Sequence, residues 1–107
     1  MILIVTRSRM NPGALDEYEP MAERMSELAR AVPGYIAHKG FVAEDGERVT
    51  IVEFESEDAL QEWVIHPEHR MAKKRGFESF FSEFKFQICN VIKERAWVAR
   101  TKSVARK

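Results

Sequence analysis

The alternation of apolar and polar residues predicts four β-strands in the first 93 positions. Each predicted strand is rich in β-branched and aromatic residues and is bounded by sequence that favours turns or helices. The strands are expected at residues 2–9, 35–43, 48–55 and 83–93. An Asp-Gly pair, Asp45-Gly46, lies between the second and third strands and predicts a hairpin there.

Helices are predicted between the first and second strands and between the third and fourth. Apolar side chains recur every three or four positions over residues 15–32, which predicts one long amphipathic helix, with Pro20 in its first turn or producing a kink. Ser56 is a typical N-cap for a second helix, and Pro67 suits the first position of a third, closed by Gly76. The order of elements predicts an α+β, ferredoxin-like βαββαβ fold with a four-stranded antiparallel sheet and its helices on one face.

Both faces of the predicted sheet are apolar. In the first strand Ile2 and Ile4 alternate with Leu3 and Val5, and the second and third strands show the same two-sided pattern. Helices on one face leave the other uncovered, and an antiparallel sheet that faces water is normally polar on that side. We therefore expect a second copy of the chain to cover the free face, as a homodimer packed sheet to sheet.

Composition restricts the class of protein and of partner. A chain of 107 residues, 45% hydrophobic and 32% charged, is typical of one globular domain. Seventeen basic and seventeen acidic residues cancel, so no overall charge favours nucleic acid or an anionic membrane as a partner. Cys89 is the single cysteine, and the apolar run at the N-terminus is too short for a signal peptide or a membrane span. We therefore expect a cytoplasmic protein.

Charge is nevertheless uneven along the chain. From Lys93 to Lys107 there are six basic residues and one acidic residue, Glu94. We divide the chain into a folded domain over residues 1–95 and a basic C-terminal tail over residues 96–107. The tail is interpreted as a solvated end or as an arm that reaches a second subunit, in preference to a nucleic-acid arm.

Two histidines are the main candidates for chemistry, because the standard motifs for nucleotide binding, serine hydrolysis and zinc chemistry are absent. His66 and His69 are three residues apart, and a histidine titrates near neutral pH, so either is a candidate general base. A metal site there would need further ligands from Glu62, Glu68 or the distant His38, and we predict no metal. The alternative is that both histidines simply belong to a helix start.

Aromatic residues are concentrated in the second half of the chain. They either fill the core between helices and sheet or form the wall of a pocket for a flat organic ligand. In the second interpretation the two histidines and Arg70 supply polar contacts. The predicted pocket residues are Trp63, Arg70, Phe80, Phe81 and Phe84.

The order and spacing of several short segments resemble the antibiotic biosynthesis monooxygenase family over residues 2–95. The resemblance rests on Pro33-Gly34-Tyr35, Val52-Glu53-Phe54, Ala59-x-x-x-Trp63, His66-Pro67-Glu68-His69 and the closing strand from Phe84 to Val91. It implies a dimeric α/β barrel built from two ferredoxin-like subunits. Some members of this family oxygenate polycyclic aromatic phenols or quinols with O₂ and without metal or flavin, whereas others degrade haem, isomerise or bind small metabolites.

The resemblance places Trp63 at the site tryptophan of both the cofactor-free oxygenases and the haem degraders. The haem degraders also use an asparagine on the first strand and an axial histidine after the tryptophan. Here the corresponding positions fall near Thr6 or Arg7 and near Lys73, so both differ. The leading hypothesis is therefore a monooxygenase with no cofactor that acts on an aromatic phenol or hydroquinone-type small molecule. The alternatives are a non-catalytic dimeric protein that binds a small metabolite and, less favoured, a haem-binding or haem-degrading protein.

Overall fold

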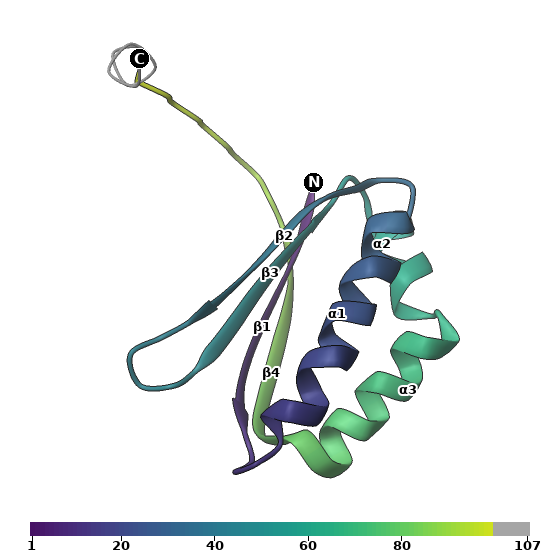
Figure 1. Ribbon diagram of the computed structural model, residues 1–107. Helices are drawn as coiled ribbons and strands as arrows, with labels where there is room; N and C mark the ends of the chain where they lie inside the picture. The colour runs from purple at the N-terminus through teal and green to yellow at the C-terminus, as the bar shows by residue number, and fades with distance from the viewer. Residues whose placement is uncertain (100–107) are drawn as a thin grey trace, which may run out of the picture.

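The predicted strands form one antiparallel sheet in the computed structural model, which describes residues 1–99 (Figure 1). The strand order is β2-β3-β1-β4, and every neighbouring pair is antiparallel. The bounds are β1 Ile2–Met10, β2 Tyr35–Val42, β3 Arg48–Phe54 and β4 Phe81–Asn90. This arrangement confirms the α+β, ferredoxin-like fold.

The last strand is shifted relative to its predicted range of 83–93. It begins at Phe81, opposite Met10, and ends at Asn90, opposite Ile2. The reason is that, within residues 1–99, β4 is an edge strand with β1 as its one neighbour, so it forms strand pairs where β1 lies beside it. Residues 91–93 lie past the start of β1 at Ile2 and therefore do not continue the strand, whatever their β propensity.

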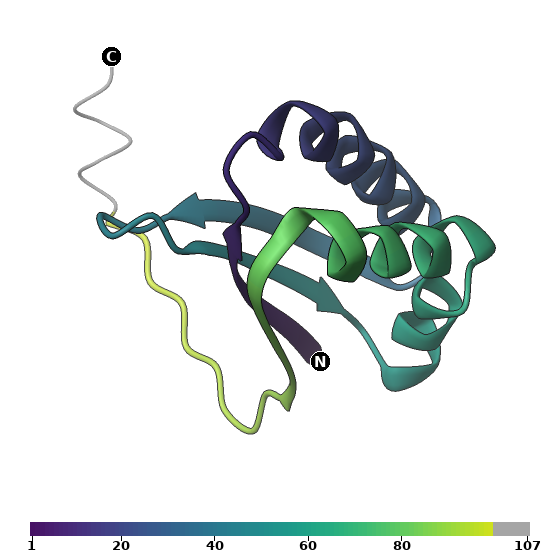
Figure 2. The same ribbon diagram turned by 90° about the horizontal axis from the view of Figure 1, so that it is seen from below.

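The helices all lie on one face of the sheet, as Figures 1 and 2 show. Their bounds are α1 Leu15–Ala31, α2 Glu57–Val64 and α3 Pro67–Arg75, followed by the π-helical turn η1 Gly76–Phe80. Ser56 caps α2 as predicted, because its Oγ accepts a hydrogen bond from the Ala59 N–H at 3.2 Å. Pro20 lies inside α1 rather than in its first turn, and its missing N–H leaves the Asp16 carbonyl without the usual partner.

Gly76 does not close α3 in the way predicted. Its φ of −58° is right-handed and helical, so the chain continues directly into η1. A glycine is needed there for another reason: an added Cβ would lie 2.6 Å from Cε2 of the Phe81 ring. The glycine therefore allows β4 to return close against the end of the helix.

The buried core lies between the helices and the helix-facing side of the sheet. Strand pairing places Ile4 opposite Val52 and Ile2 opposite Phe54 on that side. Phe54 is fully buried. The complete buried cluster is Ile2, Ile4, Ala29, Val52, Phe54, Ala59 and Leu60.

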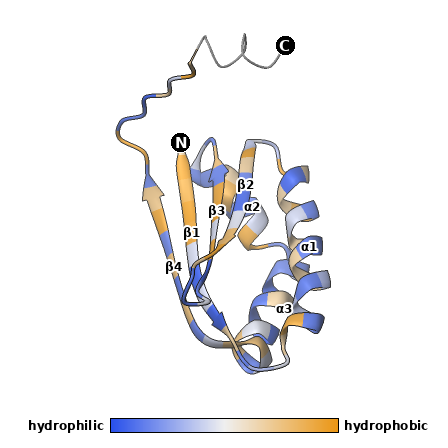
Figure 3. Ribbon diagram, turned by 60° about the vertical axis from the view of Figure 1, so that its left-hand side comes forward, coloured by the Kyte–Doolittle hydropathy of each residue, from blue (hydrophilic) through white to orange (hydrophobic). Residues whose placement is uncertain are grey.

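In residues 1–99 the outer face of the sheet carries no helix, as the ribbon in Figure 3 shows. The strand register shows that this face is apolar in part. The register places Val5 beside Ile51 and Phe41 beside Val49 on this face. Phe41 is 48% exposed there. The two-sided apolar pattern expected from the sequence is thus present in the folded sheet.

After β4 the chain leaves the sheet as an extended arm over residues 91–99, which Figure 1 shows projecting away from the helices. Its large apolar side chains make little contact: Ile92 is 93% exposed, Trp97 85% and Val98 76%. The division at residue 95 stays a prediction, and residues 100–107 of the predicted basic tail lie outside the described residues. Among residues 1–99, no helix is long and apolar enough to cross a membrane.

Candidate functional site

A cavity of about 210 Å³ lies between the sheet and the helical layer. Its wall is mostly apolar and aromatic, with a few polar side chains from both layers. The main apolar and aromatic lining residues are Tyr18, Met21, Met25, Trp63, Phe80, Phe81 and Phe84. The polar and titratable ones are Thr6, Ser26, His38, Thr50, His69 and Lys73. An apolar cavity with a small set of polar groups is the usual form of a small-molecule site.

Trp63 is fixed in the cavity wall by contacts to three different elements. Its indole Nε1–H donates to the carbonyl of Met25 in α1 at 3.2 Å. Its ring centroid lies 5.7 Å from that of Phe54 in β3 and 4.4 Å from that of His69 in α3. Trp63 is therefore both a lining residue and part of the packing around the core.

His69 is the predicted histidine that lines the cavity. Burial lowers the pKa of its imidazole below the ordinary value; the Val64 carbonyl opposes the shift, and the charges of Lys73 and His66 add to it. Its Nδ1 is buried without a hydrogen bond of good geometry. The ring is consequently neutral at pH 7 and able to accept a proton.

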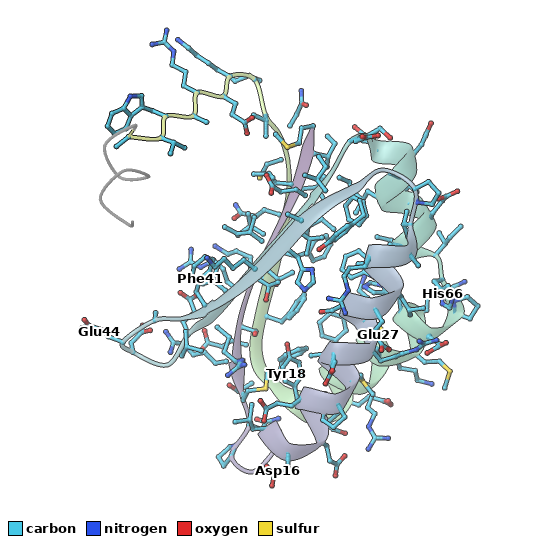
Figure 4. All side chains as sticks on the ribbon, turned by 45° about the horizontal axis from the view of Figure 1, so that its top comes forward. Asp16, Tyr18, Glu27, Phe41, Glu44 and His66 are labelled. Carbon is cyan, nitrogen blue, oxygen red and sulfur yellow. The ribbon has the colours of Figure 1, made fainter. Side chains whose placement is uncertain are left out.

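His66 and Arg70, the other predicted polar site residues, are not among the cavity-lining residues. His66 precedes Pro67 and caps α3, with its Nδ1 accepting the Glu68 N–H at 3.1 Å. Figure 4 shows it at the outer edge of the helical layer. Arg70 is exposed on α3. Of the two candidate bases, only His69 is placed to meet a ligand in this cavity.

The predicted aromatic residues Phe80, Phe81 and Phe84 all line the cavity. Phe81 lies 5.0 Å from Phe84, centroid to centroid, and Tyr18 of α1 makes edge contacts with Phe80 and Phe81 at 6.0 and 5.8 Å. Tyr18 is one of the apolar positions of the predicted helix over residues 15–32 and was not predicted as a site residue. Edge-to-face contacts of this kind hold the rings at the end of the cavity near η1.

His38 on β2 is a site residue that the sequence interpretation considered only as a distant metal ligand. Its Nδ1 lies 2.6 Å from the hydroxyl of Tyr35. Burial, with a smaller contribution from the charge of Arg30, lowers the pKa of His38. Its position opposite the buried Val52 is the signal that could have assigned it to the helix-facing side.

The positions that the family resemblance associates with haem can now be located. Thr6 lines the cavity at the first-strand position, and Lys73 lines it where the axial histidine is expected. A lysine ammonium has no lone pair for iron, and about 210 Å³ is below the roughly 300–1,000 Å³ of pockets for drug-sized ligands. These residues do not fit haem. Within residues 1–99, no three His, Cys, Asp or Glu side chains converge as metal ligands.

Comparison with known proteins gives consistent matches. The family model for antibiotic biosynthesis monooxygenase matches residues 1–75. The uncharacterized protein YqjZ of Bacillus subtilis (strain 168) is 30% identical over 84 residues, which cover 78% of this chain and 74% of YqjZ.

Two solved structures show the same fold. SnoaB, a cofactor-independent oxygenase from Streptomyces nogalater, is 18% identical with a TM-score of 0.72, covering 87% of this chain and 94% of SnoaB. Rv0793 from Mycobacterium tuberculosis is 19% identical with a TM-score of 0.78, covering 89% of this chain and 98% of Rv0793.

Proposed function

Because the chain belongs to the antibiotic biosynthesis monooxygenase family, we propose that it oxygenates a small phenol or hydroquinone-type aromatic in this cavity without a cofactor. The observation that carries the proposal is the pairing of a neutral, half-buried His69 with the ring of Trp63 inside a largely apolar cavity. The indole offers a flat stacking surface, and the imidazole offers a proton acceptor next to it. The likeness to SnoaB in fold is consistent with this chemistry.

In the proposed reaction the protein only has to bind the substrate and remove one proton from it. A phenol with a free ring carbon that becomes a quinone gains one oxygen atom from O₂ and loses two hydrogens. Those hydrogens leave as water with the second oxygen atom, so the substrate supplies all the electrons. Deprotonation by His69 makes the ring electron-rich enough to donate them, and Trp63 and the phenylalanines orient the ring away from water.

Non-catalytic binding of a small aromatic metabolite is the second candidate function. The observation that favours it is that, among residues 1–99, the buried Nδ1 of His69 makes no hydrogen bond of good geometry. Efficient histidine bases are usually oriented by a second group on this nitrogen. Both functions use the same cavity, and they differ only in whether O₂ is consumed.

Oxygen uptake distinguishes these functions. We expect the purified full-length protein to consume O₂ with one- or two-ring phenols or hydroquinones, one O₂ for each quinone formed. The measurement is an oxygen electrode with product analysis, alongside calorimetric binding of the same compounds. Binding without oxygen uptake would establish the second candidate. Absence of both, or a haem absorption band in the purified protein, would overturn the proposal.

We also propose that the outer sheet face is covered by a second copy of the chain, which gives a dimeric α/β barrel. Two arginines on that side are paired within the subunit: Arg7 with Glu47 at 2.9 Å and Arg9 with Asp45 at 2.8 Å. Two such faces can therefore approach without burying unpaired arginines. The exposed apolar arm over residues 91–99 is suited to extend the same contact.

Assembly is tested by sedimentation. We expect the full chain to sediment at about twice 12.4 kDa and Ile51→Asp to sediment as a folded monomer, because Ile51 faces outward and a buried charge opposes association. Gln61→Asp, on the exposed side of α2, is the matched control and should remain dimeric. Removing residues from Glu94 onward should weaken the dimer. A wild-type monomer at micromolar concentration would contradict the proposal, and an unchanged dimer after truncation would identify the tail as a solvated end.

A further inference from the structure

The charged side chains around the cavity are of one sign. Within the described residues 1–99, no aspartate or glutamate lines it, whereas Lys73 brings a positive charge from α3. The two lining histidines are neutral at pH 7, since burial lowers the pKa of both. In the described part of the chain, Lys73 is therefore the one fully charged side chain that lines this cavity.

Lys73 also lacks an acidic partner among residues 1–99. The ion pairs in this part of the chain use Arg7, Arg9, Arg24 and Arg75. The Nζ of Lys73 instead lies 5.3 Å from the ring centroid of Phe86 on β4, which brings the ammonium across from the helical layer to the sheet. Lys73 follows His69 by one helical turn on the same side of α3, and both line the cavity.

The sheet wall of the cavity contributes neutral polar side chains. Nδ1 of His38 lies 2.6 Å from the Tyr35 hydroxyl, so Tyr35 occupies this nitrogen and leaves Nε2 of His38 without Tyr35 beside it. Thr6 and Thr50 add two hydroxyls, which can donate a hydrogen bond to an anionic oxygen. Among residues 1–99, no carboxylate lies in this wall to repel such an oxygen.

We propose that the cavity selects an aromatic ligand that carries an anionic oxygen, a carboxylate or a phenolate, with Lys73 as its counter-charge. The inference rests on the proposed function, because it assumes that the cavity between sheet and helices is the ligand site. A cation without a partner beside an apolar wall favours an amphipathic anion: the ring is buried and the charge meets the ammonium at the rim. Lys73 itself is exposed, so solvent screening limits the preference to about tenfold.

The preference for an anionic ligand is tested with pairs of compounds that differ in charge. We would titrate the full-length protein calorimetrically with 1-naphthoate and its neutral amide, and with 2,4-dinitrophenolate and its neutral methyl ether. The anion of at least one pair is expected to bind about tenfold more tightly than its neutral partner. The pair that shows the difference identifies the carboxylate or the phenolate as the preferred group.

Variants assign the preference to one residue. Lys73→Met keeps the alkyl chain and should abolish the anion preference, and Lys73→Arg should retain it. Lys74→Met is the matched control, since Lys74 is exposed on α3 and is not a cavity-lining residue. Equal binding of anion and neutral partner in both pairs, or a preference that survives in Lys73→Met, would overturn the inference while leaving the aromatic site intact. Failure of all four probes to bind would instead count against the proposed function.

Discussion

His69→Gln is expected to lower the turnover rate by about 10²–10⁴-fold with little change in ligand affinity. Glutamine fills a similar volume against Trp63 but cannot accept a proton at neutral pH. His66→Gln is the matched control, because His66 caps α3 away from the cavity. That control should leave turnover nearly unchanged and cost about 1 kcal/mol of stability at most. Equal loss of activity in the two variants would contradict the assignment of His69 as the base.

The pH dependence of turnover and of stability tests the role of His69 as the base independently. The folded-state pKa of His69 lies below its ordinary value of 6.5, chiefly through burial. Turnover needs the neutral imidazole of His69. We therefore expect the turnover rate to be constant above pH 6.5 and to fall only as the pH drops through the lowered pKa of His69. The unfolded chain takes up the proton first, so the free energy of unfolding should also decrease as pH falls below 6.5. Both effects should be smaller in His69→Gln, and superimposable profiles would contradict the prediction.

Phe54→Ala is expected to cost about 3–5 kcal/mol of unfolding free energy, which is a large part of the stability of a domain of this size. Phe54 is fully buried, and its ring lies 6.2 Å from that of Tyr35 and 5.7 Å from that of Trp63. The truncation would leave a cavity beneath both side chains. Urea unfolding followed by circular dichroism measures the loss.

Two further variants calibrate this measurement. Phe54→Leu retains most of the volume and should cost about 1.5 kcal/mol or less. Phe77→Ala is the control for removing a phenylalanine ring, because Phe77 is 51% exposed on η1. It should cost clearly less than Phe54→Ala. If the two alanine variants unfolded at the same urea concentration, the packing around Phe54 would not be the main support of this core.

Local sequence signals predicted the elements well because their causes are local. The Ser56 cap and the start of α3 at Pro67 depend on residues within one helical turn. Gly76 shows the limit of this reasoning. A glycine after a helix suggests a left-handed cap, but here the requirement comes from the ring of Phe81 packed against its backbone. Such a contact becomes visible only when β4 is placed beside the helix end.

The candidate site was predicted only in part for similar reasons. From their spacing, His66 and His69 were equivalent candidates. In the structure α3 begins at Pro67, so His66 caps the helix whereas His69 lies within it and lines the cavity. The Tyr35–His38 pair was missed because residues three apart in a regular strand face opposite sides. The register shift between Tyr35 and Ala37 brings the two side chains together.

Trp63 shows that packing and ligand binding are not alternatives here. The sequence interpretation treated core filling and a pocket wall as alternatives for the aromatic residues. In the fold Trp63 contacts Phe54, His69 and the Met25 carbonyl while it also lines the cavity. Stability loss in Trp63→Phe is therefore compatible with a ligand site.

The chain's two tryptophans lie in very different surroundings, and this gives it a built-in optical readout. Trp63 packs in the cavity wall, so its fluorescence should be emitted at shorter wavelength and be quenched when an aromatic ligand stacks on it. Trp97 on the arm is 85% exposed, so its emission should be at longer wavelength and respond to whatever covers the arm. Replacing either one with phenylalanine would leave a single emitter, and ligand binding and subunit association could then be followed as separate spectral signals in the same protein.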